Sequence, residues 1–300
     1  MKNMKYKIIL WGIGYVYNRT QSLIKYFELL NQIEIVGITA QKVPCAKMLD
    51  GYRIFEIKEI QKVEYDYIIV LSDNYYEEIV KTAVNEFGIE RKKVINYKIL
   101  HIPNINMNQY FKLYESELTI LSNNCWGGIA YNTLGMECLS PFKNLFINDY
   151  DYLIILSNLK YYIGINPQFS RNETDIHTGI EYPVLKIENI EIHCNHYTDS
   201  CKAIDDWIRR AKKINYDNIL CEMYTENRNI AEKFNNLKQY NNKICFVPWQ
   251  SKNKNDIYLK LGYNQTEFYQ AVNSTALLDN NGIQYSLLDF LSGTSKVRLK

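Results

Sequence analysis

The sequence is poor in several features that would point directly to a function. The net charge is only +2 over 300 residues and no basic stripe stands out, so binding of nucleic acid is not expected. A weak basic cluster, TSKVRLK, ends the sequence and is interpreted as a solvated tail. No apolar run approaches the roughly 18 residues of a membrane-spanning helix. The opening MKNMKYKIILWGIGY is typical of a first strand and not of a signal peptide. We therefore expect a cytoplasmic protein without an integral membrane segment.

Histidine and paired cysteines are also scarce. There are four histidines, and the seven cysteines form neither a CxxC pair nor a regular framework. Scattered thiols in a chain of this size are typical of a reducing compartment. Hydrophobic residues make up 47% and charged residues 23% of the sequence, which is the composition of a globular protein. The length indicates two ordinary domains.

The first hundred residues alternate between strand-like and helix-like segments. The strand-like runs are KYKIILWG, IEIVGIT and DYIIVLSD. The helix-like segments are YNRTQSLIKYFELL and NYYEEIVKTAVNEFG. Continuous apolar strands between helices predict an α/β fold with a parallel sheet covered on both faces. We expect a Rossmann-like domain over residues 1–100, a linker and connecting helix over 101–116, and a second, more irregular α/β domain over 117–300.

A pair of glycines follows the first expected strand. Gly12 and Gly14 stand where a Rossmann phosphate loop lets the backbone approach a pyrophosphate at a helix N-terminus. The third glycine of that fingerprint is replaced by Tyr17, and the second strand ends in GITAQK without an acidic residue for a ribose. NAD is therefore not expected. The two glycines either bind the phosphate of a nucleotide or nucleotide-sugar, or only make a tight turn.

The stretch SNNCWGG combines a thiol with a turn at the end of an expected strand. If a helix begins near Trp126, its N-terminus would lower the pKa of the Cys125 thiol. The backbone N–H groups of Gly127 and Gly128 would then face an oxyanion. The alternative is a buried and inert Cys125, which is the commoner state of a cysteine.

His196 is the candidate base for this thiol. It follows the run NIEIHC, past the expected end of a strand, and Asp199 is close enough in sequence to orient its ring, as in a Cys–His pair. Strand alternation places His193 on the face opposite Cys194. A zinc site built from these histidines with Cys125 and Cys194 is not expected, because HCNH lacks the usual ligand spacing. No metal is predicted.

Further polar residues are candidates for binding a ligand. Asn123 and Asn124 either make turns through their own backbone or hydrogen-bond the hydroxyl groups of a sugar. In DDWIRRAKKIN, Trp207 is expected in the core, and Arg210 shares its helix face. Arg210 is therefore the candidate for an internal arginine that binds phosphate, whereas Arg209 is expected to face solvent.

Four separated segments resemble a bacterial family of unknown function, DUF1919. They are SNNCWGG, SPFKNLFI, YPVLKIENIEIHCNHY and DDWIRRAKKINYDNIL, and the resemblance covers roughly residues 117–250. The matching positions are Ser122, Asn123, Asn124, Cys125, Gly127, Gly128, Ser140, Pro141, Tyr182, Pro183, His193, His196, Tyr197, Trp207, Arg210 and Asn215. The sequence departs from the family pattern at Leu185 and Cys194, where glycine and phenylalanine are expected. Members are often labelled exopolysaccharide or capsule biosynthesis proteins, so the resemblance implies that pathway.

Three hypotheses for the function remain open. The first is a glycosyl- or acyl-transferase in bacterial surface-polysaccharide biosynthesis, acting on a nucleotide-linked or sugar substrate with His196 as base. The second is a non-catalytic protein that binds a nucleotide-sugar or serves in assembly. The third is a Cys125-dependent acyl transferase or hydrolase.

The catalytic candidates are His196, Cys125 and Asp199, and the residues predicted to bind substrate are Asn123, Asn124, Gly127, Gly128, His193, Tyr197 and Arg210. The sequence identifies neither the donor nor the acceptor. It also leaves open whether the protein forms a homo-oligomer.

Overall fold

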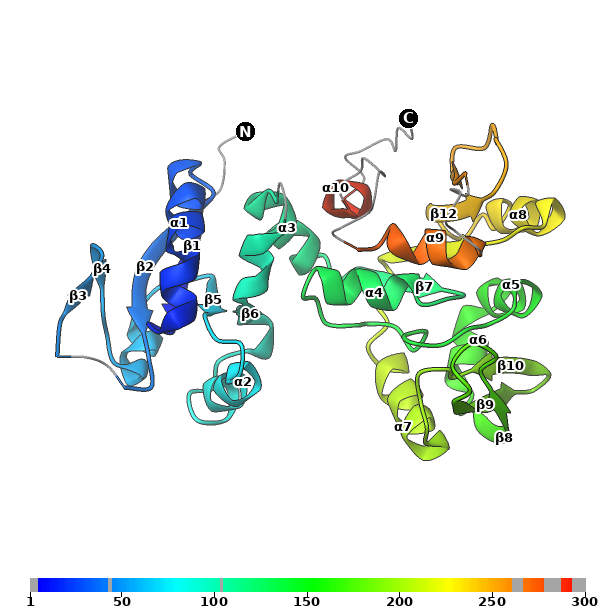
Figure 1. Cartoon of the computed structure of the whole chain (residues 1–300), viewed down its shortest axis with the longest axis horizontal. Coiled ribbons are helices and arrows are strands. Elements are labelled where there is room, and N and C mark those ends of the chain that lie inside the picture. Colours follow the sequence, from blue (N-terminus) through cyan, green and yellow to red (C-terminus); the bar gives the residue numbers. More distant parts are fainter. Residues whose placement is uncertain (1–4, 43–44, 103–104, 261–266, 278–286, 293–300) are drawn as a thin grey trace. The chain divides into compact units, whose positions relative to one another are not determined.

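The chain divides into two compact units, Met1–Lys112 and Leu113–Lys300 (Figure 1). The computed structural model describes residues 5–42, 45–102, 105–260, 267–277 and 287–292. The boundary between the units falls inside the segment predicted to connect the domains, which also contains residues 103–104, outside the described ranges. The basic C-terminal cluster, residues 294–300, lies outside them as well. Each unit is described by itself.

The N-terminal unit is built on a parallel sheet of four strands in the order β2-β1-β5-β6. The strands are β1 (Tyr6–Trp11), β2 (Ile33–Thr39), β5 (Tyr67–Val70) and β6 (Val94–Asn96). The helical segments are α1 (Tyr15–Leu29), η1 (Ile57–Lys62), α2 (Tyr76–Asn85), η2 (Arg91–Lys93), η3 (Tyr97–His101) and α3 (Met107–Glu115), and β3 (Met48–Leu49) pairs with β4 (Tyr52–Arg53).

Apolar side chains cover both faces of this sheet, as the continuous apolar runs predict. On one face, Ile79 and Val80 of α2 pack against Ile9 and Val70. On the other face, Phe111 of α3 stacks on Tyr67, with ring centroids 4.4 Å apart. A parallel sheet needs this double covering because its connections place helices on its faces. The predicted α/β class is confirmed.

The C-terminal unit combines a parallel and an antiparallel sheet. The parallel sheet has the order β13-β12-β11-β7 and the antiparallel sheet the order β10-β9-β8. The strands are β7 (Thr119–Ser122), β8 (Gln168–Thr174), β9 (Glu181–Ile187), β10 (Ile190–His193), β11 (Ile219–Tyr224), β12 (Asn242–Val247) and β13 (Asp256–Tyr258). The helices are α4 (Trp126–Thr133), α5 (Asp149–Ser157), α6 (Leu159–Gly164), α7 (Ser200–Ala211), α8 (Arg228–Asn235), α9 (Phe268–Ser274) and α10 (Leu287–Leu291).

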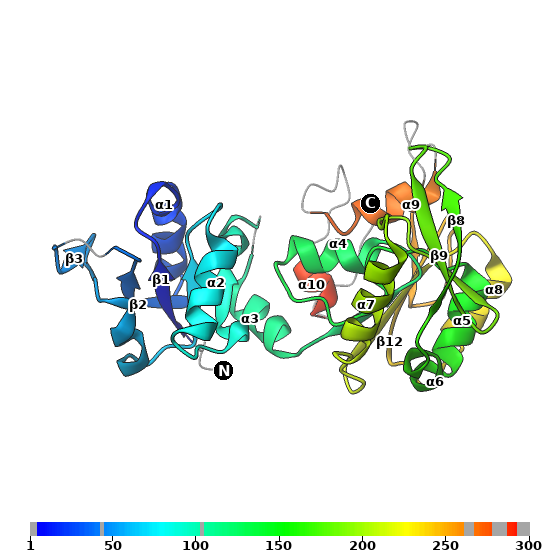
Figure 2. The ribbon, with the colours of Figure 1, turned by 90° about the horizontal axis from the view of Figure 1, so that it is seen from below.

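The two faces of the parallel sheet bury different elements. Leu121, Cys221 and Met223 point into a core shared with α5 to α8 and with the inner face of the antiparallel sheet. Figure 2 shows α7 running beside β9 in this layer. On the opposite face, Trp126 of α4 lies 6.0 Å from Phe246, measured between ring centroids. Residues at odd and even positions of one strand therefore belong to two separate cores.

The segment between α4 and α5 ties the two sheets of this unit together. The N–H of Phe146 donates to the carbonyl of His193 (2.8 Å), and the N–H of His193 donates back to Phe146 (2.9 Å). The next residue, Ile147, donates its N–H to the carbonyl of Asn123 (3.0 Å). These bonds place the end of β10 beside the end of β7. They therefore bring together the segment that carries Cys125 and the segment that carries His196.

Candidate functional site

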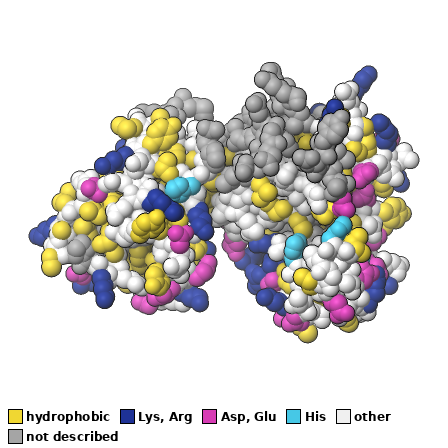
Figure 3. Space-filling view, viewed as in Figure 1, with side chains coloured by type: hydrophobic (Ala, Val, Ile, Leu, Met, Phe, Trp, Pro, Cys, Tyr) yellow, Lys and Arg dark blue, Asp and Glu magenta, His cyan; other side chains and the backbone are white. Residues whose placement is uncertain are grey.

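Cys125 and His196 are in contact at the carboxyl end of the parallel sheet. The distance from Cys125 Sγ to His196 Nε2 is 3.2 Å, although the residues are 71 positions apart in the sequence. Cys125 directly precedes α4, and His196 follows β10. Cys125 is partly exposed and His196 is exposed. The imidazole can therefore be reached from solvent, and the thiol in part. Figure 3 shows that the surface of the C-terminal unit carries histidine side chains among polar and apolar ones.

The pKa of the Cys125 thiol is raised to about 11, mainly by burial and to a smaller extent by the negative charge of nearby Glu222. The expectation that the start of α4 would lower this pKa is wrong. A helix N-terminus favours the thiolate by a modest electrostatic effect, whereas the cost of removing the sulfur from water and the neighbouring carboxylate both oppose it. The resting form of Cys125 is thus a neutral thiol, with its Sγ in hydrogen-bond contact with Nε2 of His196.

Side chains from the end of β7 hold the first turn of α4. Asn124 Oδ1 accepts the N–H of Trp126 (2.7 Å), and Ser122 Oγ accepts the N–H of Gly127 (3.1 Å). These bonds satisfy helix amides that have no partner within the helix. In the described part of the chain, the N–H of Cys125 itself has no hydrogen-bond partner. The N–H of Gly128 likewise has no partner among the described residues, so these two N–H groups remain available to an oxyanion at this turn.

Gly127 and Gly128 are buried and serve the packing of α4. A Cβ on Gly127 would lie 2.6 Å from Ser122 Oγ, and one on Gly128 would lie 3.2 Å from Asn144 Oδ1. Both glycines let the helix approach its neighbours closely. The structure assigns the Gly127 N–H to Ser122, so the predicted contact of these glycines with a substrate stays a prediction.

Asn123 links three elements below the reactive pair. Its Nδ2 donates to Asp149 Oδ1 (3.2 Å) and to the carbonyl of Tyr224 (3.3 Å), and its Oδ1 accepts from Asn124 Nδ2 (2.9 Å). Its side chain is completely buried. Burial also raises the pKa of Asp149. Asn123 therefore supports the site from inside, and binding of a sugar hydroxyl by its side chain stays a prediction.

Glu222 is the residue of this site that the sequence analysis missed. It lies in the middle of β11, paired in register with Ser122, and its side chain is completely buried. Both carboxyl oxygens accept from Asn124 Nδ2, at 3.2 and 3.1 Å. Desolvation raises its pKa to about 8. An acidic residue inside the apolar run NILCEMY was the available signal, because such a residue is rarely buried without a reason.

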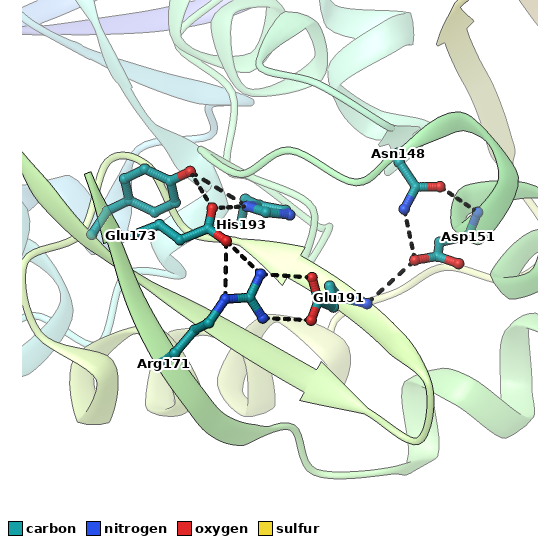
Figure 4. A network of polar contacts seen from close by, with 7 residues as sticks. Asn148, Asp151, Arg171, Glu173, Glu191 and His193 are labelled. Atoms are coloured by element: carbon teal, nitrogen blue, oxygen red, sulfur yellow. Dashed lines mark hydrogen bonds and ion pairs between the residues drawn. The ribbon is translucent and has the colours of Figure 1, made fainter. Parts of the chain in front are cut away.

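His193 belongs to a separate polar network on the outer face of the antiparallel sheet (Figure 4). Its Nδ1 lies 3.2 Å from Glu173 Oε2 and 3.4 Å from the hydroxyl of Tyr182. The guanidinium of Arg171 bridges Glu173 and Glu191. The predicted alternation of β10 is confirmed, since Ile192 and Cys194 are buried and His193 is on the opposite face. The predicted role of His193 in binding substrate stays a prediction.

Arg210 is internal and already paired. It is 9% exposed, and its two terminal nitrogens donate to the Tyr197 hydroxyl (2.9 Å) and to Asp206 Oδ2 (2.9 Å). Arg209 is exposed, as predicted. Asp199 accepts the N–H of Cys201 (2.9 Å) and thereby caps α7. These contacts give Tyr197, Arg210 and Asp199 structural roles at α7. The predicted binding of substrate by Tyr197 and Arg210, and the predicted orientation of the His196 ring by Asp199, stay predictions.

The two N-terminal glycines differ in what they require. Gly12 has φ +129°, and a Cβ there would lie 2.9 Å from the carbonyl oxygen of Leu71. Gly14 precedes α1 with φ −90°, and a Cβ there would meet nothing within 4 Å. The turn therefore requires glycine at position 12 but not at position 14. Nucleotide binding at either glycine stays a prediction.

We expect Gly12→Ala to lower the free energy of unfolding by about 2 kcal/mol, because a strained φ and a backbone clash act together. Gly14→Ala is expected to cost less than about 1 kcal/mol, since only the preference at a helix start changes. Chemical denaturation of both variants measures this difference. Equal losses of unfolding free energy in the two variants would contradict this prediction. If Gly14→Ala, but not Gly12→Ala, weakened the binding of a nucleotide, a phosphate site would lie at this turn.

The part of the chain that the structure describes contains no group of three or more His, Cys, Asp or Glu side chains suited to a metal ion. Within the same residues, no helix has both the length and the apolar character needed to cross a membrane.

The fold and the site define a two-unit α/β protein with an accessible Cys–His contact at the edge of a parallel sheet. Residues 96–291 match the family described as Domain of unknown function (DUF1919), and the chain belongs to this family. Residues 4–95 match a second family, described as C2185-like, N-terminal. An uncharacterized protein of Haemophilus influenzae is 31% identical over 147 residues, which is 48% of this chain and 68% of that relative. The family resemblance of the sequence motifs is confirmed, and none of these descriptions names a reaction.

Proposed function

We propose that this protein is a cysteine-dependent acyl transferase or hydrolase, with Cys125 as nucleophile and His196 as base. The observation that carries the proposal is the 3.2 Å contact between Sγ and Nε2. Nucleophile and base within hydrogen-bond reach are the signature of an activated thiol. Because His196 is exposed and Cys125 is partly exposed, a substrate can approach the pair from solvent.

The geometry supports a two-step acyl transfer. The Sγ–H proton moves to His196 Nε2 while Sγ forms a bond to the acyl carbon. The resulting oxyanion lies at the N-terminus of α4, where the free N–H of Cys125 and the helix dipole favour negative charge. The leaving group departs with the proton from Nε2 and leaves a thioester on Cys125. A hydroxyl group or water, deprotonated by His196, then attacks the thioester and restores the thiol.

We propose a sugar hydroxyl as acceptor, in the assembly of a bacterial surface polysaccharide. The support is the pathway implied by the family resemblance. Transfer of an acyl group to a sugar is compatible with both the transferase hypothesis and the thiol hypothesis. A protein that only binds a nucleotide-sugar would not need a thiol in contact with an accessible imidazole.

The covalent intermediate is the direct test of the proposed function. Protein incubated with p-nitrophenyl acetate or acetyl-CoA and quenched in acid should gain one acetyl group, located at Cys125 by peptide mass spectrometry. A Cys45→Ser/Cys201→Ser variant is the matched control, because it removes two exposed thiols and should keep the adduct. Acetylation at the exposed cysteines alone, or no adduct from any activated ester, would contradict the proposal. Stabilisation by a nucleotide-sugar without turnover would favour the binding protein instead.

A further inference from the structure

Glu222 is a fully buried carboxyl group directly behind the reactive turn, and the acyl-transfer steps above do not use it. Its position on β11 is fixed from both sides, by pairing with Ser122 of β7 and with Ile244 of β12. Within the described ranges, no Lys, Arg or His forms an ion pair with it. A buried carboxylate without a cation is costly, so the location of Glu222 requires an explanation.

The hydrogen bonds of Glu222 lead straight to the turn that carries Cys125. Both of its oxygens accept from Asn124 Nδ2. The other end of the same amide, Asn124 Oδ1, accepts the N–H of Trp126 at 2.7 Å. Asn124 and Trp126 are the two neighbours of Cys125 in the sequence. The backbone on either side of the thiol is therefore connected, through one amide, to one buried carboxyl group.

We propose that Glu222 is a positioning residue for Cys125: as a neutral acid it holds the Asn124 amide and the turn, and as a carboxylate it opposes the thiolate. This inference rests on the proposed function, since it assigns a role relative to the nucleophile of that reaction. The protonated group is the form that suits catalysis, because a negative charge behind Sγ works against proton transfer to His196.

Among the groups near Glu222, the Cys125 thiol is the one on which its charge is expected to act. The other ionisable groups whose charges couple to it are Tyr152 of α5, Tyr224 of β11 and Cys245 of β12. Burial raises the pKa of all three, so they are neutral at physiological pH. Desolvation likewise raises the pKa of Glu222 to about 8, against the weaker opposing effects of Asn124 and Ser122. Glu222 therefore changes charge in a pH range where Cys125 is still a thiol.

Alkylation of Cys125 by iodoacetamide, followed from pH 7 to pH 12, tests the effect of the charge. The full chain is used with Cys45→Ser and Cys201→Ser, so that Cys125 is read by peptide mass spectrometry without the exposed thiols. Glu222→Gln removes the charge and keeps the shape, and it should move the midpoint of the rate profile down by about half to one pH unit. At pH 9 the Gln variant should react about three- to tenfold faster. A midpoint equal to that of the parent, or higher, would overturn this role.

Glu222→Ala tests the hydrogen-bonded positioning. It should have the lower midpoint of the Gln variant, but an altered alkylation rate across the whole range, because Asn124 loses its partner. Identical profiles for the Ala and Gln variants would show that the contact with Asn124 contributes nothing. If the variants do not fold, ¹³C NMR of labelled glutamate in the parent protein gives the titration of the Glu222 carboxyl group. A parent alkylation profile without an inflection at that titration would refute the coupling.

The outcomes separate this inference from the proposed function. Alkylation needs no acyl substrate, so an absent acyl adduct with a shifted alkylation midpoint would reject acyl transfer and retain the link between Glu222 and Cys125. An acyl adduct with an unshifted midpoint would retain acyl transfer and reject the link between Glu222 and Cys125.

Discussion

Replacing His196 with Ala is expected to slow acyl-enzyme formation by about 10²- to 10⁴-fold, the usual contribution of a positioned acid–base group. The reason lies in the state of the thiol. With its pKa raised to about 11, Cys125 is a thiolate in only about one molecule in ten thousand at pH 7. Attack on an acyl group therefore depends on a base that takes the proton during the step, and Nε2 at 3.2 Å is in place to do so. Stopped-flow release of p-nitrophenol measures the rate.

His177→Ala is the matched control for that experiment. His177 is exposed and lies next to Glu267, with 3.5 Å between Nε2 and Oε1. Its loss should leave the rate within about twofold of the parent, because substitution of an exposed residue outside the Cys125–His196 contact acts weakly. The difference between the two variants should narrow as the pH approaches 11, where hydroxide replaces the base. A His196→Ala variant as fast as the His177→Ala variant at pH 7 would reject His196 as the base.

The sequence predicts the members of this pair but not their contact. Cys125 and His196 were both candidates because each follows an apolar strand, and strand ends commonly carry functional groups. Their contact depends on the backbone pairing of Phe146 with His193 and on the bond from Ile147 to Asn123. Those bonds form in an irregular segment without periodicity, so no pattern in the sequence reports them.

Glu222 and the charge state of Cys125 escaped prediction for a related reason. In the sequence, Glu222 is one acidic residue in an apolar run, and its partner Asn124 is 98 positions away. A helix N-terminus acts on Cys125 through local geometry, whereas the effects that decide the pKa of its thiol come from burial and from Glu222 of β11. The sequence does predict β1, β2 and β5 of the N-terminal sheet, because a strand that is buried on both faces is a continuous apolar run.

Strand β8 has no signal in the sequence that predicts a strand. Its sequence, QFSRNET, is almost entirely exposed in the structure and has no apolar alternation. It forms a strand because β9 provides a partner and because Arg171 bridges acidic residues across the sheet. Pairing and ion-pair geometry of this kind arise from tertiary structure, which overrides local preference.

The stability of the protein should fall with rising pH because of Glu222. Its pKa is raised from 4.5 in the unfolded chain to about 8 in the fold, so the folded state binds this proton more tightly. The contribution to stability is complete below pH 4.5 and is lost as the pH rises toward 8 and beyond. Integrating the difference in proton binding between pH 5 and pH 8 gives a loss on the order of 3 kcal/mol for this fully buried group.

Glu222→Gln lacks the titrating group and should not show this loss. The free energy of unfolding in urea, measured at pH 5, 6, 7 and 8, should therefore rise for the Gln variant relative to the parent as the pH increases. Glu232→Gln, an exposed position on α8, serves as control and should follow the parent within about 0.5 kcal/mol at every pH. A difference between the Glu222→Gln variant and the parent that does not change with pH would mean that the buried carboxyl group keeps the same charge throughout. The same result would remove the basis for a charge-dependent effect of Glu222 on Cys125, because only a group that gains charge near neutral pH can oppose the thiolate there.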